Sequence, residues 1–237
     1  MFATIKADVN AIFKKDPAAT GLIEVLLCYS GLHALIAHRI NHFLYKIHIP
    51  ILPRLFAQVA RFFTGVEIHP AAKIGRGVVI DHGMGVVIGE TSEIGDGVLI
   101  YQGVTLGGVS LNKGKRHPTI GNNVTIGAGA AVLGPIKVGD GSVVGSGAVV
   151  VKSVPPGCTV VGIPGKVVNL ERLKLNRPDL VENPDPEAIV IECILRRLEA
   201  LETCISANGS MTEEERIKTC VFQQGDVTQS GQCLTSR

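Results

Sequence analysis

The chain has 237 residues, enough for one or two compact domains, and a formal net charge of +2. No basic stripe stands out, so nucleic acid is a poor default partner. The first residues lack the layout of a signal peptide, and polar and charged residues such as Glu24, His33 and Arg39 interrupt the apolar run from Leu22 to Leu44. We therefore expect a cytoplasmic protein with no membrane span.

The cysteines give no sign of a metal site or of a disulfide framework. They show neither C-x-x-C pairing nor metal-ligand spacing. We expect six reduced thiols, at Cys28, Cys158, Cys193, Cys204, Cys220 and Cys233.

Residues 1–65 are predicted to form an α-helical cap. Thr4 is a plausible N-cap of the first helix, and Asp16-Pro17 ends that helix. Gly31 and the Pro50–Pro53 turn are expected to separate later helices. Amphipathic spacing predicts helices over Thr4–Lys15, Gly21–Tyr29, Leu32–Tyr45 and Leu52–Phe63.

A six-residue repeat organises the segment from Val66 to Val151. A small residue, most often glycine, usually follows the aliphatic position, and a small or β-branched residue often returns four positions after it. Such a period fits neither an α-helix nor an ordinary sheet, but it fits a solenoid with one short strand and one corner per hexapeptide. We expect this domain to span residues 66–168 and the helical cap to cover its open end. The aliphatic positions are Ile68, Ile74, Ile80, Val86, Ile88, Ile94, Ile100, Leu106, Ile120, Ile126, Val132, Val138, Val144 and Val150.

The repeat is interrupted twice. Between Val86 and Ile88 the phase slips by two residues, and between Leu106 and Ile120 the spacing is fourteen. The polar, basic and glycine-rich segment Gly107–Thr119 is therefore predicted to protrude as a loop. Solenoids often place binding chemistry on such insertions.

The remainder of the chain is predicted to be a linker and helix at 169–205 and a disordered tail at 206–237. The helix, Glu187–Ile205, carries a short heptad stripe. Packing on its own subunit and a coiled-coil seam between subunits both stay open. The expected class is thus α+β.

A solenoid without an internal cavity must bind small molecules between coils or between subunits. The candidates are polar residues that interrupt the repeat: Glu67, His69, Asp81-His82 and Arg116-His117. Several of them lie in strings that are also familiar from a known family. The strings are Glu67–Gly75, Asp81–Thr91, Gln102–Gly108, Lys115–Pro118 and Gly162–Gly165.

These strings closely resemble serine O-acetyltransferase, a hexapeptide-repeat acyltransferase of cysteine biosynthesis. The likeness covers about Ile5 to Val168 and is strongest to the shorter bacterial form. It implies a left-handed parallel β-helix, a homotrimer or a dimer of trimers, and clefts between subunits that bind acetyl-CoA and L-serine. It implies no tightly bound cofactor and no metal.

Acetyl transfer to a hydroxyl needs a base, because a neutral alcohol is a poor nucleophile near pH 7. His82 is our candidate, since histidine titrates close to that pH. The resemblance assigns the supporting carboxylate to Glu67, where longer family members carry aspartate. A solvated corner residue is the plain alternative for Glu67.

Serine is a zwitterion, so its site needs a cation and an anion. The resemblance places Arg116 and His117 at the serine carboxylate, and Asp81 and Asp16 at the ammonium and hydroxyl end. Asp16 could instead be a routine helix stop before proline.

The resemblance also predicts the contacts of coenzyme A. Backbone N–H groups at Gly107 and Gly108 are candidate donors to the developing oxyanion. Small residues would let the pantetheine chain lie flat, and lysines would meet the phosphates. These residues are Gly108, Ala128 and Ser146, then Lys152 and Lys166.

Other functions stay open at this stage. The protein could acetylate a sugar or another small alcohol, be a trimeric zinc enzyme using His69, His82 and His117, or be a non-catalytic scaffold. The family further implies feedback inhibition by L-cysteine. Many relatives bind O-acetylserine sulfhydrylase through a C-terminal isoleucine; this chain ends in Arg237, so we expect weak or no binding by that route.

Overall fold

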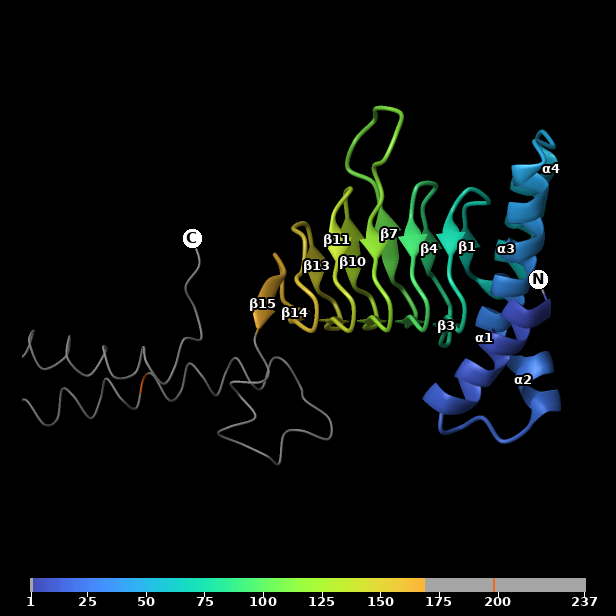
Figure 1. Ribbon diagram of the computed structural model, residues 1–237, viewed down its shortest axis with the longest axis horizontal. Helices are drawn as coiled ribbons and strands as arrows, with labels where there is room; N and C mark the ends of the chain where they lie inside the picture. The colour runs from blue at the N-terminus through green and yellow to red at the C-terminus, as the bar shows by residue number, and fades with distance from the viewer. Residues whose placement is uncertain (1, 169–197, 199–237) are drawn as a thin grey trace, which may run out of the picture. The chain divides into compact units, whose positions relative to one another are not determined.

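The computed structural model describes residues 2–168 and residue 198 (Figure 1). The predicted linker, C-terminal helix and tail lie outside the described residues, apart from Leu198. Helices come first and are followed by short strands. The helices are α1 (Phe2–Lys15), α2 (Leu22–Cys28), α3 (Ser30–Lys46) and α4 (Leu52–Thr64).

Two details of the predicted helices are wrong. The first helix begins at Phe2, so Thr4 lies inside it and is not its N-cap. Helices α2 and α3 are separated by Tyr29 rather than by Gly31, which is buried within α3. A Cβ on Gly31 would lie 1.9 Å from the carbonyl oxygen of Ile80. The glycine therefore serves close packing of α3 on the strands and does not break the helix.

The strands between residues 67 and 168 form three sheets, in which β1 to β14 pair in parallel and β15 lies beside β14. Among β1 to β14, neighbouring strands in a sheet come from successive coils, and the first strand of each sheet has one neighbour only. This arrangement confirms the repeat-based prediction, and the left-handed coil is consistent with it. The first sheet contains β1 (Glu67–Ile68), β4 (Val87–Ile88), β7 (Thr105–Gly107), β10 (Ala131–Leu133) and β13 (Val149–Val150). The second contains β2 (Lys73–Ile74), β5 (Glu93–Ile94), β8 (Thr119–Ile120) and β11 (Lys137–Val138). The third contains β3 (Val79–Ile80), β6 (Leu99–Ile100), β9 (Thr125–Ile126), β12 (Val143–Val144), β14 (Thr159–Val161) and β15 (Lys166–Val168).

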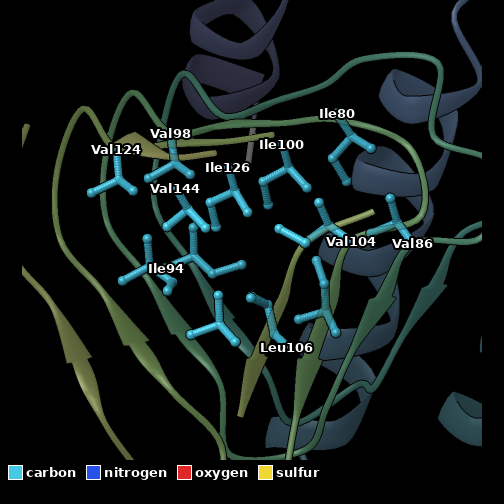
Figure 2. Close-up of a cluster of buried hydrophobic side chains, with 14 of the residues drawn as sticks. Ile80, Val86, Ile94, Val98, Ile100, Val104, Leu106, Val124, Ile126 and Val144 are labelled. Atoms are coloured by element: carbon cyan, nitrogen blue, oxygen red, sulfur yellow. The ribbon is translucent and has the colours of Figure 1, made fainter. Parts of the chain in front are cut away.

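Aliphatic side chains fill the interior of the coil in stacked layers (Figure 2). Ile100, Leu106 and Ile126 are fully buried, as are corner residues such as Val98 and Val104. Burying one such side chain stabilises a fold by about 1.5–3 kcal/mol. The hexapeptide period therefore arises because the aliphatic residue of each repeat is buried in this core.

Strand registers locate both interruptions of the repeat. Thr125 pairs with Val143, eighteen residues on, which is the length of three hexapeptides. The first coil is two residues longer, since Val79 pairs with Leu99. The two extra residues lie in the 81–86 corner between β3 and β4. The predicted position, between Val86 and Ile88, is therefore wrong: Val86 is the buried corner residue that precedes β4, and the insertion comes before it. The second interruption is the loop that leaves the coil after β7 (Figure 1).

A buried ion pair ties the helices to the first coil. Arg39 Nη2 lies 2.9 Å from Asp8 Oδ2, and the Asp8 side chain is 1% exposed. Arg39 also donates to the carbonyl oxygens of Ile74 (3.1 Å) and Gly75 (2.7 Å). Burial raises the pKa of Asp8 although Arg39 opposes that shift. The division into separate cap and coil domains stays a prediction.

Two further predictions concern the membrane and the thiols. In the part of the chain that the structure describes, no helix by itself has the length and apolar character to cross a bilayer. Helices α2 and α3 have them only when taken together, and the pair is bent by 70°. Cys28 and Cys158 are free, and the other cysteines lie outside the described residues.

Candidate active site

The two-residue insertion at the 81–86 corner turns the chain through left-handed backbone conformations. His82 has φ = 57°, and Gly83 and Gly85 have φ values of 74° and 75°. Such a conformation is uncommon for a residue with a side chain and often marks functional sites. It is held by hydrogen bonds from the Gly83 N–H to the Asp81 carbonyl (2.7 Å) and from the Met84 N–H to the His82 carbonyl (3.0 Å). The imidazole projects outward and is 72% exposed.

Two predicted carboxylates lie near His82. Asp81 Oδ2 is 3.9 Å from His82 Nε2. Asp16, just after α1, accepts hydrogen bonds from the Tyr29 hydroxyl and from the Ala18 N–H (2.8 Å). Both bonds, the Tyr29 bond most, lower the pKa of Asp16, and the charge of nearby His82 lowers it further. The structure thus brings Asp16, Asp81 and His82 together at one corner.

Glu67 lies on the coil next to this corner, but its carboxylate has a different partner. Its Oε2 is 2.9 Å from Arg61 Nη1 on α4, and both side chains are partly exposed. Its backbone N–H donates to the carbonyl of Val86 (2.9 Å). Glu67 and Arg61 line an open groove of about 500 Å³ between α4 and the corner. Within residues 2–168 no hydrogen bond joins Glu67 to His82.

Arg116 and His117 lie at the base of the protruding loop. Arg116 Nη2 is 2.6 Å from Glu90 Oε2. His117 Nδ1 is 2.9 Å from the hydroxyl of Thr91, and its ring lies against Gly89, where a Cβ would be 2.0 Å from His117 Cδ2. Burial, and then the charge of Arg116, lower the pKa of His117. This second group is therefore preorganised before any ligand binds.

The two groups occupy different corners of the triangular coil. His82 lies between β3 and β4, whereas Arg116 lies between β7 and β8. A single chain does not bring them into one cleft.

The predicted coenzyme A residues, apart from Lys166 on β15, are divided between these two corners. In the later coils, backbone hydrogen bonds of 2.8 Å connect the corners that stack on the His82 corner. The Gly129 N–H donates to the carbonyl oxygen of Gln102, and the Gly147 N–H donates to that of Ala128. Ala128 and Ser146 belong to this corner. Gly107 and Gly108 belong to the corner of Arg116, and Lys152 and Lys166 are exposed beyond β13 and on β15.

The histidines considered for zinc are not gathered in the chain. His69 Nε2 is 2.8 Å from Arg54 Nη1, and burial followed by the charge of Arg54 lowers the pKa of His69. His69 and His117 are near one corner and His82 is at another. Across the described residues, no cluster of three His, Cys, Asp or Glu side chains could hold a metal ion.

Sequence reasoning assigned no role to Tyr29, Glu90 or Thr91. Glu90 and Thr91 stand in the Asp81–Thr91 string, so their contact with Arg116 and His117 had a local signal. Tyr29 had no such signal in the sequence. Its contact with Asp16 depends on the break between α2 and α3 and on the turn that follows α1, thirteen residues earlier.

Comparison with known proteins gives a consistent result. The family model "Serine acetyltransferase, N-terminal" matches residues 1–37, and "Bacterial transferase hexapeptide (six repeats)" matches residues 117–152. A serine acetyltransferase of Synechococcus elongatus is 51% identical, over 95% of this chain and 93% of that protein.

Solved structures agree with these matches. The serine acetyltransferase of Neisseria gonorrhoeae in complex with serine has a TM-score of 0.69 and 45% identity, covering 71% of this chain and 69% of that one. The enzyme of Brucella abortus in complex with coenzyme A has a TM-score of 0.69 and 39% identity, covering 71% and 67%. A serine acetyltransferase in complex with cysteine has a TM-score of 0.70 and 40% identity, covering 70% and 69%.

Proposed function

Because this chain belongs to the serine acetyltransferase family, we propose that its two groups of polar residues form one active site, across a subunit boundary. The enzyme transfers the acetyl group of acetyl-CoA to the hydroxyl of L-serine and releases O-acetyl-L-serine and CoA. This step activates serine for cysteine biosynthesis. The observation that carries the proposed site is the separation of His82 and Arg116 on two corners of one chain.

His82 is the proposed general base. Its imidazole takes the proton of the serine hydroxyl as the oxygen attacks the thioester carbonyl, and it returns a proton to the departing thiolate. No covalent enzyme intermediate is needed. The imidazolium formed in between is stabilised by a neighbouring carboxylate. The Asp81 carboxylate lies near it, with Oδ2 at 3.9 Å from His82 Nε2. Glu67 can take this role only if its carboxylate leaves its ion pair with Arg61 and turns to His82.

The remaining charges match the serine zwitterion. Arg116 and His117 bind its carboxylate, while Asp16 and Asp81 receive its ammonium group. Gly107 and Gly108 line the thioester end, and Ala128, Ser146 and Lys166 follow the pantetheine chain toward the phosphates. A trimer places the Arg116 corner of one subunit against the His82 corner of the next, which would also cover an imidazole that is 72% exposed in one chain.

Regulation and location are part of the same proposal. Cysteine differs from serine by one atom and would compete for the same pocket, in keeping with the cysteine complex of a relative. Unchanged cysteine inhibition as serine is raised would argue against this. We expect a cytoplasmic enzyme with no stable sulfhydrylase complex through its C-terminus.

Mixed trimers test the shared site directly. His82→Ala should abolish turnover, and Arg116→Ala should mainly raise the KM for serine. When the two variants are unfolded together and refolded as a mixture, about one quarter of the sites should combine an intact His82 with an intact Arg116 from the neighbour. Recovered activity at low serine supports the proposal. Activity that never exceeds the sum of the separate variants contradicts it.

Two controls address the other candidate functions. Stoichiometric zinc that activity requires would favour the metal enzyme. Faster acetylation of another alcohol than of serine would assign the acceptor differently.

A further inference from the structure

Tyr29, which separates α2 from α3, and the first two residues of α3 each contact the corner of the proposed site or the strand that leads into it. Tyr29 has extended backbone angles, φ −92° and ψ 96°, and its hydroxyl donates to Asp16 Oδ2. The Ser30 hydroxyl donates to the carbonyl oxygen of His82 (3.2 Å). Gly31 lies directly on the Ile80 carbonyl. One short segment therefore connects to both the base and the acidic end of the proposed pocket.

We propose that Tyr29 is a positioning residue for the binding of serine. The Tyr29 hydroxyl fixes the Asp16 carboxylate in the position where that carboxylate receives the ammonium group of the substrate. This inference rests on the proposed function, because it takes Asp16 to be part of the serine site. It adds a residue that neither the repeat nor the family strings point to.

The hydrogen bonds around Asp16 explain why the hydroxyl matters. The Ala18 N–H binds Oδ1 and the Tyr29 hydroxyl binds Oδ2, so each oxygen is fixed by one donor and keeps acceptor capacity for the ligand. The bond to Asp16 raises the pKa of Tyr29 to about 12, with smaller contributions from burial and from the charges of Asp16, Glu24 and Asp81, so the hydroxyl stays a donor at neutral pH.

Without the hydroxyl, one carboxylate oxygen is held by nothing that the described residues supply. The Asp16 side chain would rotate among several positions, and serine binding would have to restrict it. Acetyl-CoA binding and the chemical step do not involve this carboxylate directly. The loss should therefore appear in the serine KM.

The test is Tyr29→Phe, which keeps the ring that packs against the buried cluster of α1 and α3. We expect the KM for serine to rise at least about tenfold, the scale of one hydrogen bond to a charged group, with kcat and the KM for acetyl-CoA within about twofold. Tyr45→Phe is the matched control, because Tyr45 is exposed on α3 and should leave all constants unchanged. Thermal unfolding of both variants should follow the wild type.

A double-mutant cycle separates this inference from the proposed function. In an Asp16→Asn background, Tyr29→Phe should add little to the serine KM. If Asp16→Asn raises the serine KM but Tyr29→Phe does not, the positioning role is wrong and the pocket assignment stands. If Asp16→Asn itself leaves serine binding unchanged, both the pocket assignment of Asp16 and this inference fail. A Tyr29→Phe variant that weakens both substrates alike and unfolds earlier would reduce Tyr29 to a structural residue.

Discussion

Replacing Arg39 by methionine should destabilise the protein far more than breaking an exposed ion pair. The substitution keeps an unbranched, flexible apolar side chain, shorter than arginine, but removes the hydrogen bonds to Asp8 and to the carbonyl oxygens of Ile74 and Gly75. Asp8 is 1% exposed and would keep backbone donors alone, at Gly77 and at Val78, whose N–H lies 3.3 Å away. Removing one partner of a buried pair typically costs about 3–5 kcal/mol.

The size of the loss should depend on pH. Burial already raises the pKa of Asp8, and removing Arg39 takes away the charge that opposes this shift. In the variant the carboxyl therefore takes up a proton at a higher pH than in the wild type. A neutral carboxyl is cheaper to bury, so the difference between variant and wild type should shrink as pH falls toward 4.

Urea denaturation at fixed protein concentration measures this loss, since assembly also contributes to apparent stability. Lys73→Met is the matched control: it breaks the Lys73–Glu93 pair, also 2.9 Å long but with the lysine 72% exposed. That pair should contribute at most about 1 kcal/mol. The reasoning is refuted if Arg39→Met costs no more than the control, or if its cost is the same at pH 7.5 and pH 4.5.

Three other substitutions probe the site, the histidines and the packing of the helices. Gly89→Ala should raise the serine KM at least about tenfold with the fold retained, because the added Cβ would displace the His117 ring. Gly21→Ala is the control, because a Cβ on Gly21 would meet nothing within 4 Å. Unchanged serine kinetics in both variants would contradict the role of His117. Burial lowers the pKa of His38 to about 3, below its ordinary 6.5, so the unfolded chain binds the proton first and stability should be lost as pH falls from about 6.5 toward 3. His38→Gln should flatten part of that loss in denaturation series at several pH values. His69 and His117, and the carboxyl groups of Asp16, Glu24 and Glu93, have lowered pKa values and contribute in the same direction. An unaltered pH profile would exclude His38. Gly31→Ala should cost at least about 2 kcal/mol in thermal or urea unfolding, because a methyl group 1.9 Å from the Ile80 carbonyl oxygen forces α3 away, and a stable variant would show that the helix can shift freely.

The coil could be predicted because its pattern is local. Every sixth residue fills the same layer, so the period survives in the sequence. The predicted position of the two-residue insertion was wrong because Val86 is aliphatic. Valine suits both a strand and a corner, so the sequence pattern did not show that Val86 belongs to the corner before β4. The role of Gly31 was missed for another reason: its contact with Ile80 spans distant parts of the chain, and sequence alone shows only a glycine.

The candidate site was predictable in its parts but not in its arrangement. Asp81 and His82 are adjacent in a distinctive string, and the structure adds Asp16 to their corner. The Arg61 partner of Glu67 had no signal, since arginines on exposed helices usually carry no specific contact. The separation of His82 from Arg116 follows from the three-sided coil, which no motif records.

The helices at the start of the chain have a consequence beyond the site they help to build. They lie over the end of the coil where β1, β2 and β3 have a neighbour on one side only (Figure 1). A version shortened to begin at Val66 would leave these backbone groups open to the ends of other molecules. Such a fragment should associate through this open end, because the helices no longer cover the unpaired edges of β1, β2 and β3.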